Sequence, residues 1–171
     1  MFHLNESQDL AIAQIPRCGL TTMGEWLGRD FPVVPNDDVR LRSITRRVAF
    51  VRHPIDRLES AFSMFYWMST NDRQRHVSNA PIDSWESFVD HVLDPDVTDD
   101  EHWKPQSAHV GNVPNLYHRL KDLRLKFEMY RPGILPHRHL TSRSPLIREN
   151  YRVAELGSKY ADDIILYKET N

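Results

Sequence analysis

The chain has 171 residues, of which 40% are hydrophobic and 27% are charged, and its formal net charge is −2 with histidine counted as neutral. This length favours one domain with a single sizeable core, so we expect residues 1–171 to form one domain. The near-neutral charge excludes a global field that would recruit nucleic acid or an anionic membrane surface. Any anion-binding site must therefore be local.

The only cysteine is Cys18, so no disulfide can form within the chain. A reducing, cytoplasmic location is the simpler expectation. The first eight residues are polar and acidic and lack the pattern of a secretory signal. No run approaches the roughly 18 apolar residues that cross a bilayer, so we also expect no transmembrane segment.

Two apolar segments in the first third of the chain are each followed by a loop and a helix. Leu10–Ile15 and Val48–Val51 have the length and composition of short buried strands. Thr21–Gly28 is predicted to be helical, and a second helix begins at Pro54, where apolar residues recur at helical spacing. This alternation favours an α/β fold of the P-loop-like, three-layer type, with a small central parallel sheet flanked by helices.

The second half of the chain is predicted to be mostly helix and loop. Ser84–Val92 has a helical apolar face, with Ser84 as its cap, and Asp94–Gly111 is a long loop. Tyr117–Phe127 is expected to become helical in its second half. Tyr151–Tyr160 is predicted to be the last helix, leading into the apolar run at residues 164–167.

The segment that follows the second strand indicates a phosphate clamp. Arg52 lies directly after that strand, and Ser60 lies eight positions later, in the next helix. A guanidinium at the end of a strand and a hydroxyl about two turns into the helix can converge on one phosphate. Arg57, between them, could instead pair with Asp56 or Glu59 and order the turn.

The segment that follows the first strand is a second candidate phosphate loop. Gly19 would let backbone N–H groups approach an anion, and the next helix would direct its positive end at it. Thr21 and Thr22 add hydroxyl donors, and Arg17 adds a permanent charge. By itself this loop is equally compatible with a plain strand–turn–helix that has a capping threonine.

Other chemistries fit the sequence less well. A nucleotide kinase should carry the pattern G-x-x-x-x-G-K-[ST], whereas this loop has one glycine and no lysine. The nine histidines suggest a metal site, but His137 and His139 are two positions apart and lack a suitably spaced partner, so we expect no metal. The basic loop around them could close over a phosphate, bind an anionic acceptor molecule or simply be a solvated surface.

The two loops resemble motifs of the sulfotransferases that use 3′-phosphoadenosine 5′-phosphosulfate (PAPS). Pro16–Thr22 is similar to their 5′-phosphosulfate loop, Pro-Lys-x-Gly-x-Thr/Ser-Thr/Ser. Val51–Phe62 is similar to their 3′-phosphate motif, Arg-x-Pro-x-x-Arg-Leu-x-Ser-x-Tyr/Phe. His102–Gln106 resembles the His-Trp-x-Pro segment of the Golgi-type carbohydrate sulfotransferase branch. Tyr151–Tyr167 has the layout of that branch's C-terminal helix and strand.

The resemblance implies PAPS as the sulfuryl donor and no metal. Arg52 and Ser60 would bind the 3′-phosphate. The 5′-phosphosulfate would be surrounded by Arg17, Cys18, Gly19, Leu20, Thr21 and Thr22. Arg17 stands where the family usually has lysine, and since arginine does not readily give up a proton, it would act catalytically by charge and hydrogen bonding alone.

Transfer to a hydroxyl also needs a base, and His102 is our first candidate. A neighbouring carboxylate could orient its ring, and Trp103 could stack on a sugar face or on adenine. A purely structural histidine is an equally good interpretation of His102. The reserve candidates are His109, His53, Glu25 and Glu101.

The sequence therefore predicts a sulfotransferase that moves a sulfuryl group from PAPS to a hydroxyl acceptor, with an oligosaccharide as one candidate acceptor. One alternative is a nucleotide or small-molecule kinase on the same fold. The other is a PAPS-binding or PAP-binding protein that has lost catalysis, for which the Arg17 replacement is the best argument.

Overall fold

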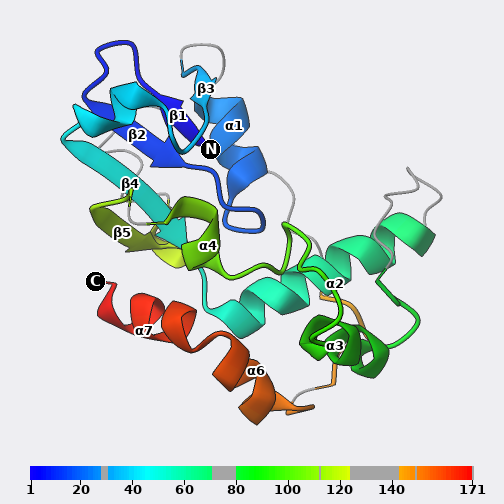
Figure 1. The fold of residues 1–171 in the computed structure, drawn as a ribbon. Coiled ribbons are helices and arrows are strands. Elements are labelled where there is room, and N and C mark those ends of the chain that lie inside the picture. Colours follow the sequence, from blue (N-terminus) through cyan, green and yellow to red (C-terminus); the bar gives the residue numbers. More distant parts are fainter. Residues whose placement is uncertain (28–30, 71–79, 112, 124–142, 149, 171) are drawn as a thin grey trace.

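A five-stranded mixed sheet forms one part of the molecule (Figure 1). The computed structural model describes residues 1–27, 31–70, 80–111, 113–123, 143–148 and 150–170. The strand order is β3-β1-β2-β4-β5. The strands are β1 (Phe2–Leu4), β2 (Leu10–Ala13), β3 (Val33–Val34), β4 (Arg46–Val51) and β5 (Leu116–Arg119).

The parallel part of this sheet is β2-β4-β5, with Ile12 opposite Val48 and Val51 opposite Arg119. This confirms the expected α/β fold. The strands β1 and β3 pair antiparallel at the other edge, which was not predicted. β1 is only three residues long, too short for its alternation to be recognised, yet Phe2 is fully buried there.

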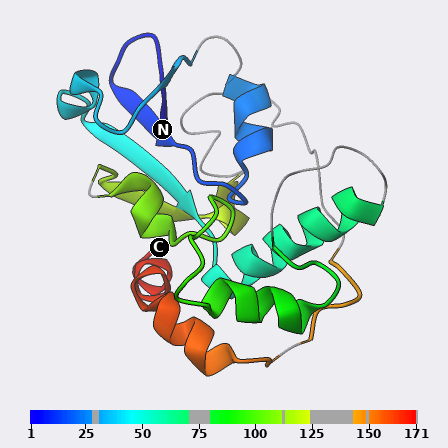
Figure 2. The same ribbon diagram turned by 45° about the vertical axis from the view of Figure 1, so that its right-hand side comes forward.

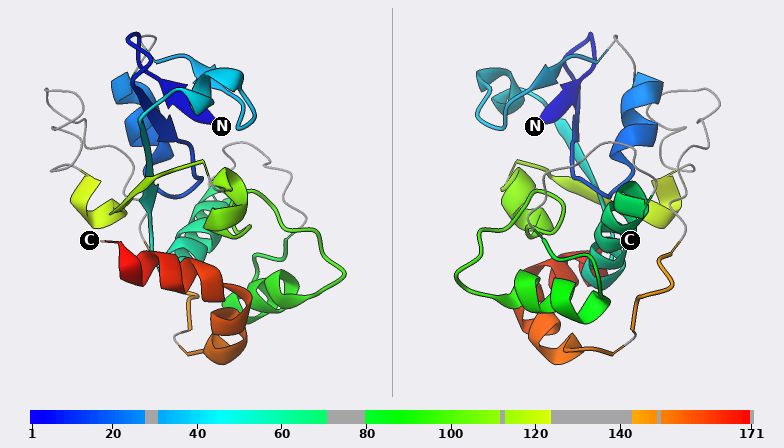
Figure 3. Two further views of the ribbon diagram at one scale, coloured as in Figure 1. Left: turned by 60° about the vertical axis from the view of Figure 1, so that its left-hand side comes forward. Right: turned by 90° about the vertical axis from the view of Figure 1, so that its right-hand side faces the viewer.

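Helices cover both faces of the sheet (Figures 1 and 3). On one face, Ile12 and Phe50 pack against Met23 of α1 (Leu20–Leu27). On the other face, the alternate positions of β2 and β4 pack against α4 (Gln106–Val110) and α7 (Ala161–Glu169). Because successive strand residues point to opposite faces, each strand contributes to two apolar layers.

A separate helical core lies beyond the carboxyl ends of the parallel strands (Figure 2). It consists of α2 (Pro54–Thr70), α3 (Trp85–Leu93) and α6 (Val153–Lys159). Its centre is aromatic: Phe62 packs between Trp85 and Phe88. The start of α2 at Pro54 and the Ser84 cap of α3, which accepts a hydrogen bond from the Ser87 N–H at 3.0 Å, are both confirmed.

Three segments differ from their predictions or go beyond them. The loop predicted at Asp94–Gly111 contains the short helix α4. Tyr117, expected at the start of a partly helical segment, lies in β5, and β5 leads into the 3-10 turn η3 (Leu120–Asp122). Another 3-10 turn, η2, spans Val39–Arg42. The strand implied after Tyr151–Tyr160 is wrong, because residues 164–167 lie within α7. A short apolar run does not distinguish strand from helix, and α7 is decided by its packing on the sheet. Within the described residues, no helix is both long and apolar enough to span a bilayer.

Candidate functional site

The loop after β2 turns sharply before α1. Arg17 has φ 65° and Gly19 has φ 80°, both in the left-handed region. A Cβ at Gly19 would lie 2.9 Å from Leu120 Cδ1 and 3.0 Å from Leu123 Cδ2. The glycine is therefore required by backbone conformation and by close packing, whatever the loop binds.

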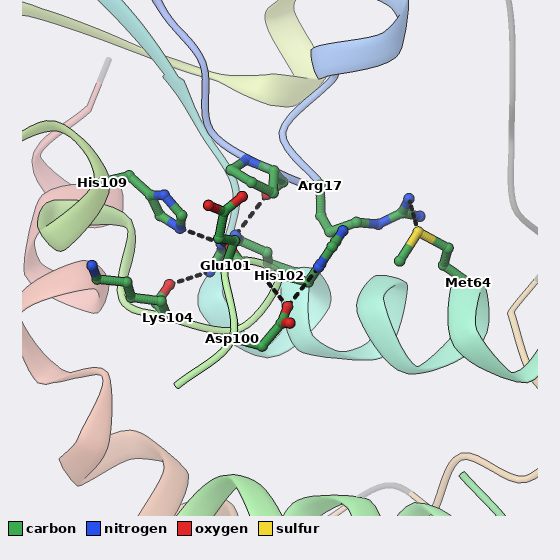
Figure 4. A network of polar contacts seen from close by, with 9 residues as sticks. Arg17, Met64, Asp100, Glu101, His102, Lys104 and His109 are labelled. Carbon is green, nitrogen blue, oxygen red and sulfur yellow. Dashed lines mark hydrogen bonds and ion pairs between the residues drawn. The ribbon is translucent and has the colours of Figure 1, made fainter. Parts of the chain in front are cut away.

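The side chain of Arg17 joins this loop to α2. Its Nη2 and Nε donate to Ser60 Oγ at 2.7 and 3.1 Å, and its Nη1 lies 3.2 Å from Met64 Sδ. Figure 4 shows the side chain directed along α2 toward Met64. The two predicted phosphate motifs are thus in direct contact, although 43 positions separate Arg17 from Ser60.

Positive charge is concentrated where the loops meet. Burial and then the neighbouring Arg52 lower the pKa of Arg17 to about 10, so Arg17 stays protonated at neutral pH. The Arg52 guanidinium makes no hydrogen bond or ion pair with the described part of the chain. A bound anion would relieve the repulsion between these two side chains.

Gln106 fixes the backbone of Arg52, a role that the sequence interpretation missed. Its Oε1 accepts from the Arg52 N–H at 2.9 Å, and its Nε2 donates to the Arg52 carbonyl at 2.8 Å. The Cys18 thiol donates to the same Oε1 at 3.1 Å, and burial raises the pKa of Cys18 to about 11. Cys18 is thus a neutral donor that faces the protein, and its proposed place at the 5′-phosphosulfate stays a prediction.

Asp163 of α7 anchors Gln106 in turn. Its carboxylate accepts from the N–H groups of Gln106 and Ser107, at 2.7 and 3.1 Å, at the start of α4. Both Gln106 and Asp163 are buried. An unbroken series of hydrogen bonds therefore connects the C-terminal helix to the Arg52 backbone.

Arg57 is buried, with 2% of its surface exposed, and it pairs with neither Asp56 nor Glu59. Its Nε donates to the Pro16 carbonyl at 2.9 Å. Its Nη1 and Nη2 donate to the carbonyls of Lys104 and Glu101, at 2.7 and 3.0 Å. Arg57 thus connects α2 to both the Arg17 loop and the His102 loop.

His102 is oriented by Asp100, and not by Glu101. The Asp100 carboxylate accepts from the His102 backbone N–H at 2.9 Å and lies 2.6 Å from ring Nδ1. The ring lies edge-on to Phe65, one residue beyond the Met64 that Arg17 contacts. With Nδ1 donating to the carboxylate, Nε2 becomes the basic nitrogen of the ring.

The expected ligand contact of Trp103 is wrong. The indole is 3% exposed and packs against Phe65 and Phe88 in the helical core. Its carbonyl accepts from Tyr160 at 2.6 Å. Trp103 therefore holds the His102 loop against α6 and cannot stack on a sugar or on adenine without unfolding that core.

The reserve bases are placed less favourably. His109 Nε2 lies 3.1 Å from Arg57 Nη2, and burial and the Arg57 charge lower its pKa to about 4. His53 lies edge-on to Tyr167. Glu25 and Glu101 are exposed. His102 remains the candidate whose ring is oriented by a carboxylate.

Some predicted residues are not placed. The side chains of Thr21 and Thr22 lie outside the described part of the structure, and so do His137, His139 and the segment around them. Leu20 is described and is the first residue of α1. Arg143, at the end of the basic loop, pairs with Glu59 at 3.0 Å. Where side chains are described, no three His, Cys, Asp or Glu residues gather as metal ligands would.

Parallel strands that end in the two candidate phosphate loops, with helices on both faces of the sheet, have the architecture of a P-loop-like α/β fold. A family model described as "Sulfotransferase family" matches residues 1–123. The chain belongs to this family and is a transferase whose family implies PAPS as the donor. Neither the curated proteins nor the solved structures gave a match.

Proposed function

We propose that this sulfotransferase moves the sulfuryl group of PAPS to a hydroxyl acceptor. The observation that carries the proposal is the contact of Arg17 with Ser60 close to the Arg52 guanidinium, which has no hydrogen-bond or ion-pair partner among the described residues. A nucleotide phosphorylated at both ends needs two anion sites at a fixed separation. The two loops supply them side by side.

Arg52 and Ser60 hold the 3′-phosphate in this proposal. Arg17 and the loop through Thr22 surround the 5′-phosphosulfate, with Gly19 setting the turn. When bound, PAPS supplies an activated sulfuryl group whose transfer, like phosphoryl transfer, depends on alignment and charge stabilisation.

Two side chains carry the proton and charge requirements. His102 Nε2 accepts the proton of the acceptor hydroxyl, and Asp100 stabilises the imidazolium that forms. Arg17, whose pKa of about 10 keeps it charged, stabilises negative charge and does not serve as a proton donor.

The acceptor class is the least constrained part of the proposal. A carbohydrate acceptor is supported by the resemblance of His102–Gln106 to the His-Trp-x-Pro segment, but not by sugar stacking, because Trp103 is buried. A cytoplasmic location rests on the single cysteine, and a single domain on the chain length.

A thermal-shift titration with adenosine 3′,5′-bisphosphate (PAP) tests the donor site. PAP should raise the midpoint of unfolding, since it binds the folded state, and AMP and ATP should do so far less. Arg52→Ala should weaken PAP binding about 10- to 100-fold, because a charge-assisted contact contributes about 1.5–3 kcal/mol. The control is Arg46→Ala at the opposite end of β4, where the exposed side chain pairs with Asp9. Equal shifts with AMP would exclude a 3′-phosphate site.

A transfer assay separates the proposal from its rivals. PAPS is offered with a panel of monosaccharides, oligosaccharides and 4-nitrophenol, with and without EDTA. Sulfuryl transfer that persists in EDTA supports the proposal. ATP turnover that EDTA abolishes would indicate a kinase. Tight PAP binding with no transfer to any acceptor would indicate an inactive nucleotide-binding protein.

A further inference from the structure

Arg57 bonds the residues that immediately precede both candidate catalytic residues. Its Nε donates to the carbonyl of Pro16, before Arg17, and its Nη2 donates to the carbonyl of Glu101, before His102. These two nitrogens form one edge of the planar guanidinium, so the two carbonyls are held at a fixed separation.

The rest of the guanidinium holds the His102 loop at two more points. Nη1 donates to the Lys104 carbonyl at 2.7 Å, and Nη2 also lies 3.1 Å from His109 Nε2. Figure 4 shows Glu101, Lys104 and His109 to one side of His102, and Arg17 with Met64 to the other. The loop is therefore bonded to Arg57 both before and after His102.

Helix α2 itself completes the arrangement. Arg57 and Ser60 are three positions apart, on the same side of the helix. Arg57 bonds the carbonyl of Pro16 while Ser60 bonds the side chain of the next residue, Arg17. Two consecutive loop residues are thus fixed by one helical turn.

Stability alone does not account for this buried cation. No carboxylate of the described chain lies within ion-pair distance of Arg57, although the residue is 2% exposed. Burial of a guanidinium costs desolvation free energy, and an apolar side chain of similar size often stabilises a fold equally well. Neither an apolar residue nor a lysine, with its single nitrogen, has the rigid guanidinium fork that holds the Pro16 and Glu101 carbonyls at a fixed separation.

We propose that Arg57 is a positioning residue that sets the spacing between Arg17 and His102. The inference rests on the proposed function, because it assigns His102 as the base. Displacing one reacting group by about 1 Å can cost about 100-fold in rate, so a loosened junction should lower kcat. The 3′-phosphate ligands Arg52 and Ser60 would be unaffected.

A double-mutant cycle tests the assignment, with PAPS and the most reactive acceptor of the panel as the probe. Arg57→Lys should lower kcat about 10- to 100-fold, and His102→Ala at least as much. In the double variant kcat should match His102→Ala within about threefold, because Arg57 acts through His102. The PAP thermal shift of Arg57→Lys should fall far less than that of Arg52→Ala, because the 3′-phosphate ligands keep their places.

The control is Ser63→Ala, which removes a buried hydrogen bond from the Ser144 N–H to the same helix. It should lower the unfolding midpoint and leave kcat unchanged. Arg57→Gln gives a second variant, in which a neutral planar amide with one donating nitrogen replaces the three donors of the guanidinium, and it should lower kcat at least as much as Arg57→Lys. Losses that add in the double variant, or variants that do not fold at all, overturn the assignment, because Arg57 would then serve the fold. A wild-type chain without transfer activity overturns the proposed function instead.

Discussion

The Arg17 side chain illustrates how one residue serves two loops. Its backbone lies in the left-handed region at φ 65°, which costs a residue with a side chain about 1 kcal/mol or more. That conformation accompanies a side chain that gives Ser60 two hydrogen bonds, from Nε and Nη2. A lysine has one nitrogen and would not reproduce this fork, so the replacement of the family's usual lysine changes geometry as well as proton chemistry.

His109 should make the fold sensitive to acid. Burial and Arg57 lower its pKa from 6.5 to about 4, so between these values the unfolded chain binds more protons than the folded chain. Stability should therefore fall as the pH drops from about 6.5 to 4, by roughly 1–2 kcal/mol after allowance for solvent screening. His109→Gln keeps an acceptor for Arg57 without titrating.

Urea unfolding at pH 7 and pH 5 measures this effect. The His109→Gln variant should lose less stability between the two values than the wild type does. Part of the slope should remain, because burial also lowers the pKa of His3. Identical losses in both proteins would show that His109 is not a source of acid sensitivity.

At the scale of the element, two glycines five positions apart show the difference between a turn and a helix, since Gly19 lies in the turn before α1 and Gly24 lies inside it. Gly19, in the turn, has φ 80° and a Cβ position within 3.0 Å of two leucine side chains. At Gly24, inside α1, no heavy atom of the described residues lies within 4 Å of the Cβ position, apart from its chain neighbours and the backbone of its own helix. One residue type thus meets two different requirements five positions apart.

Alanine substitutions should therefore have opposite signs. Gly19→Ala should destabilise the fold by about 1–3 kcal/mol, from a strained backbone and crowding at Leu120 and Leu123. Gly24→Ala should stabilise it by about 0.5–1 kcal/mol, because glycine loses more entropy in a helix. Chemical denaturation of both variants measures this difference, and a stabilised Gly19→Ala would contradict the turn geometry.

At the scale of the molecule, the C-terminal helices extend the part that matches the family model. That match ends at residue 123, yet Leu156 and Tyr160 lie in the helical core, and Leu166 packs on the sheet. The same helices also contribute a polar contact: Asp163 accepts a hydrogen bond from the Gln106 N–H, and the Gln106 side chain in turn holds the backbone of Arg52. The backbone of Arg52, in the proposed 3′-phosphate site, is therefore held through a residue more than 100 positions away.

Asp163→Asn should weaken PAP binding although Asp163 is not a proposed ligand. One carboxylate oxygen is replaced by an amide NH2 group, which cannot accept from Gln106 or Ser107, so the anchor of the Arg52 backbone is weakened. We expect a loss of about 3- to 30-fold, equivalent to about 1–2 kcal/mol. Calorimetric titration with PAP measures it. The exposed neighbour gives the control, since Asp162→Asn should bind PAP as the wild type does. Equal affinities in both variants would show that α7 does not support the clamp.

The sequence predicted the elements whose signals are local. The helix that begins at Pro54 and the Ser84 cap follow from spacing and capping chemistry within one or two turns. The sequence did not predict the short strands β1 and β3 or the helix α7. In segments this short, the spacing of apolar residues does not distinguish a strand from a helix. Their conformation depends on the partner that each finds in the folded chain.

For the site, the sequence by itself determined which residue types follow the parallel strands: Arg17 and Gly19 after β2, and Arg52 and Ser60 after β4. Chain order and strand direction bring these together at one edge of a sheet, which is why linear motifs sufficed to indicate the class of protein. Only the tertiary structure decided what Arg57, Gln106 and Trp103 do. Each is buried, and the partners of a buried side chain come from segments remote in sequence, which no local pattern specifies.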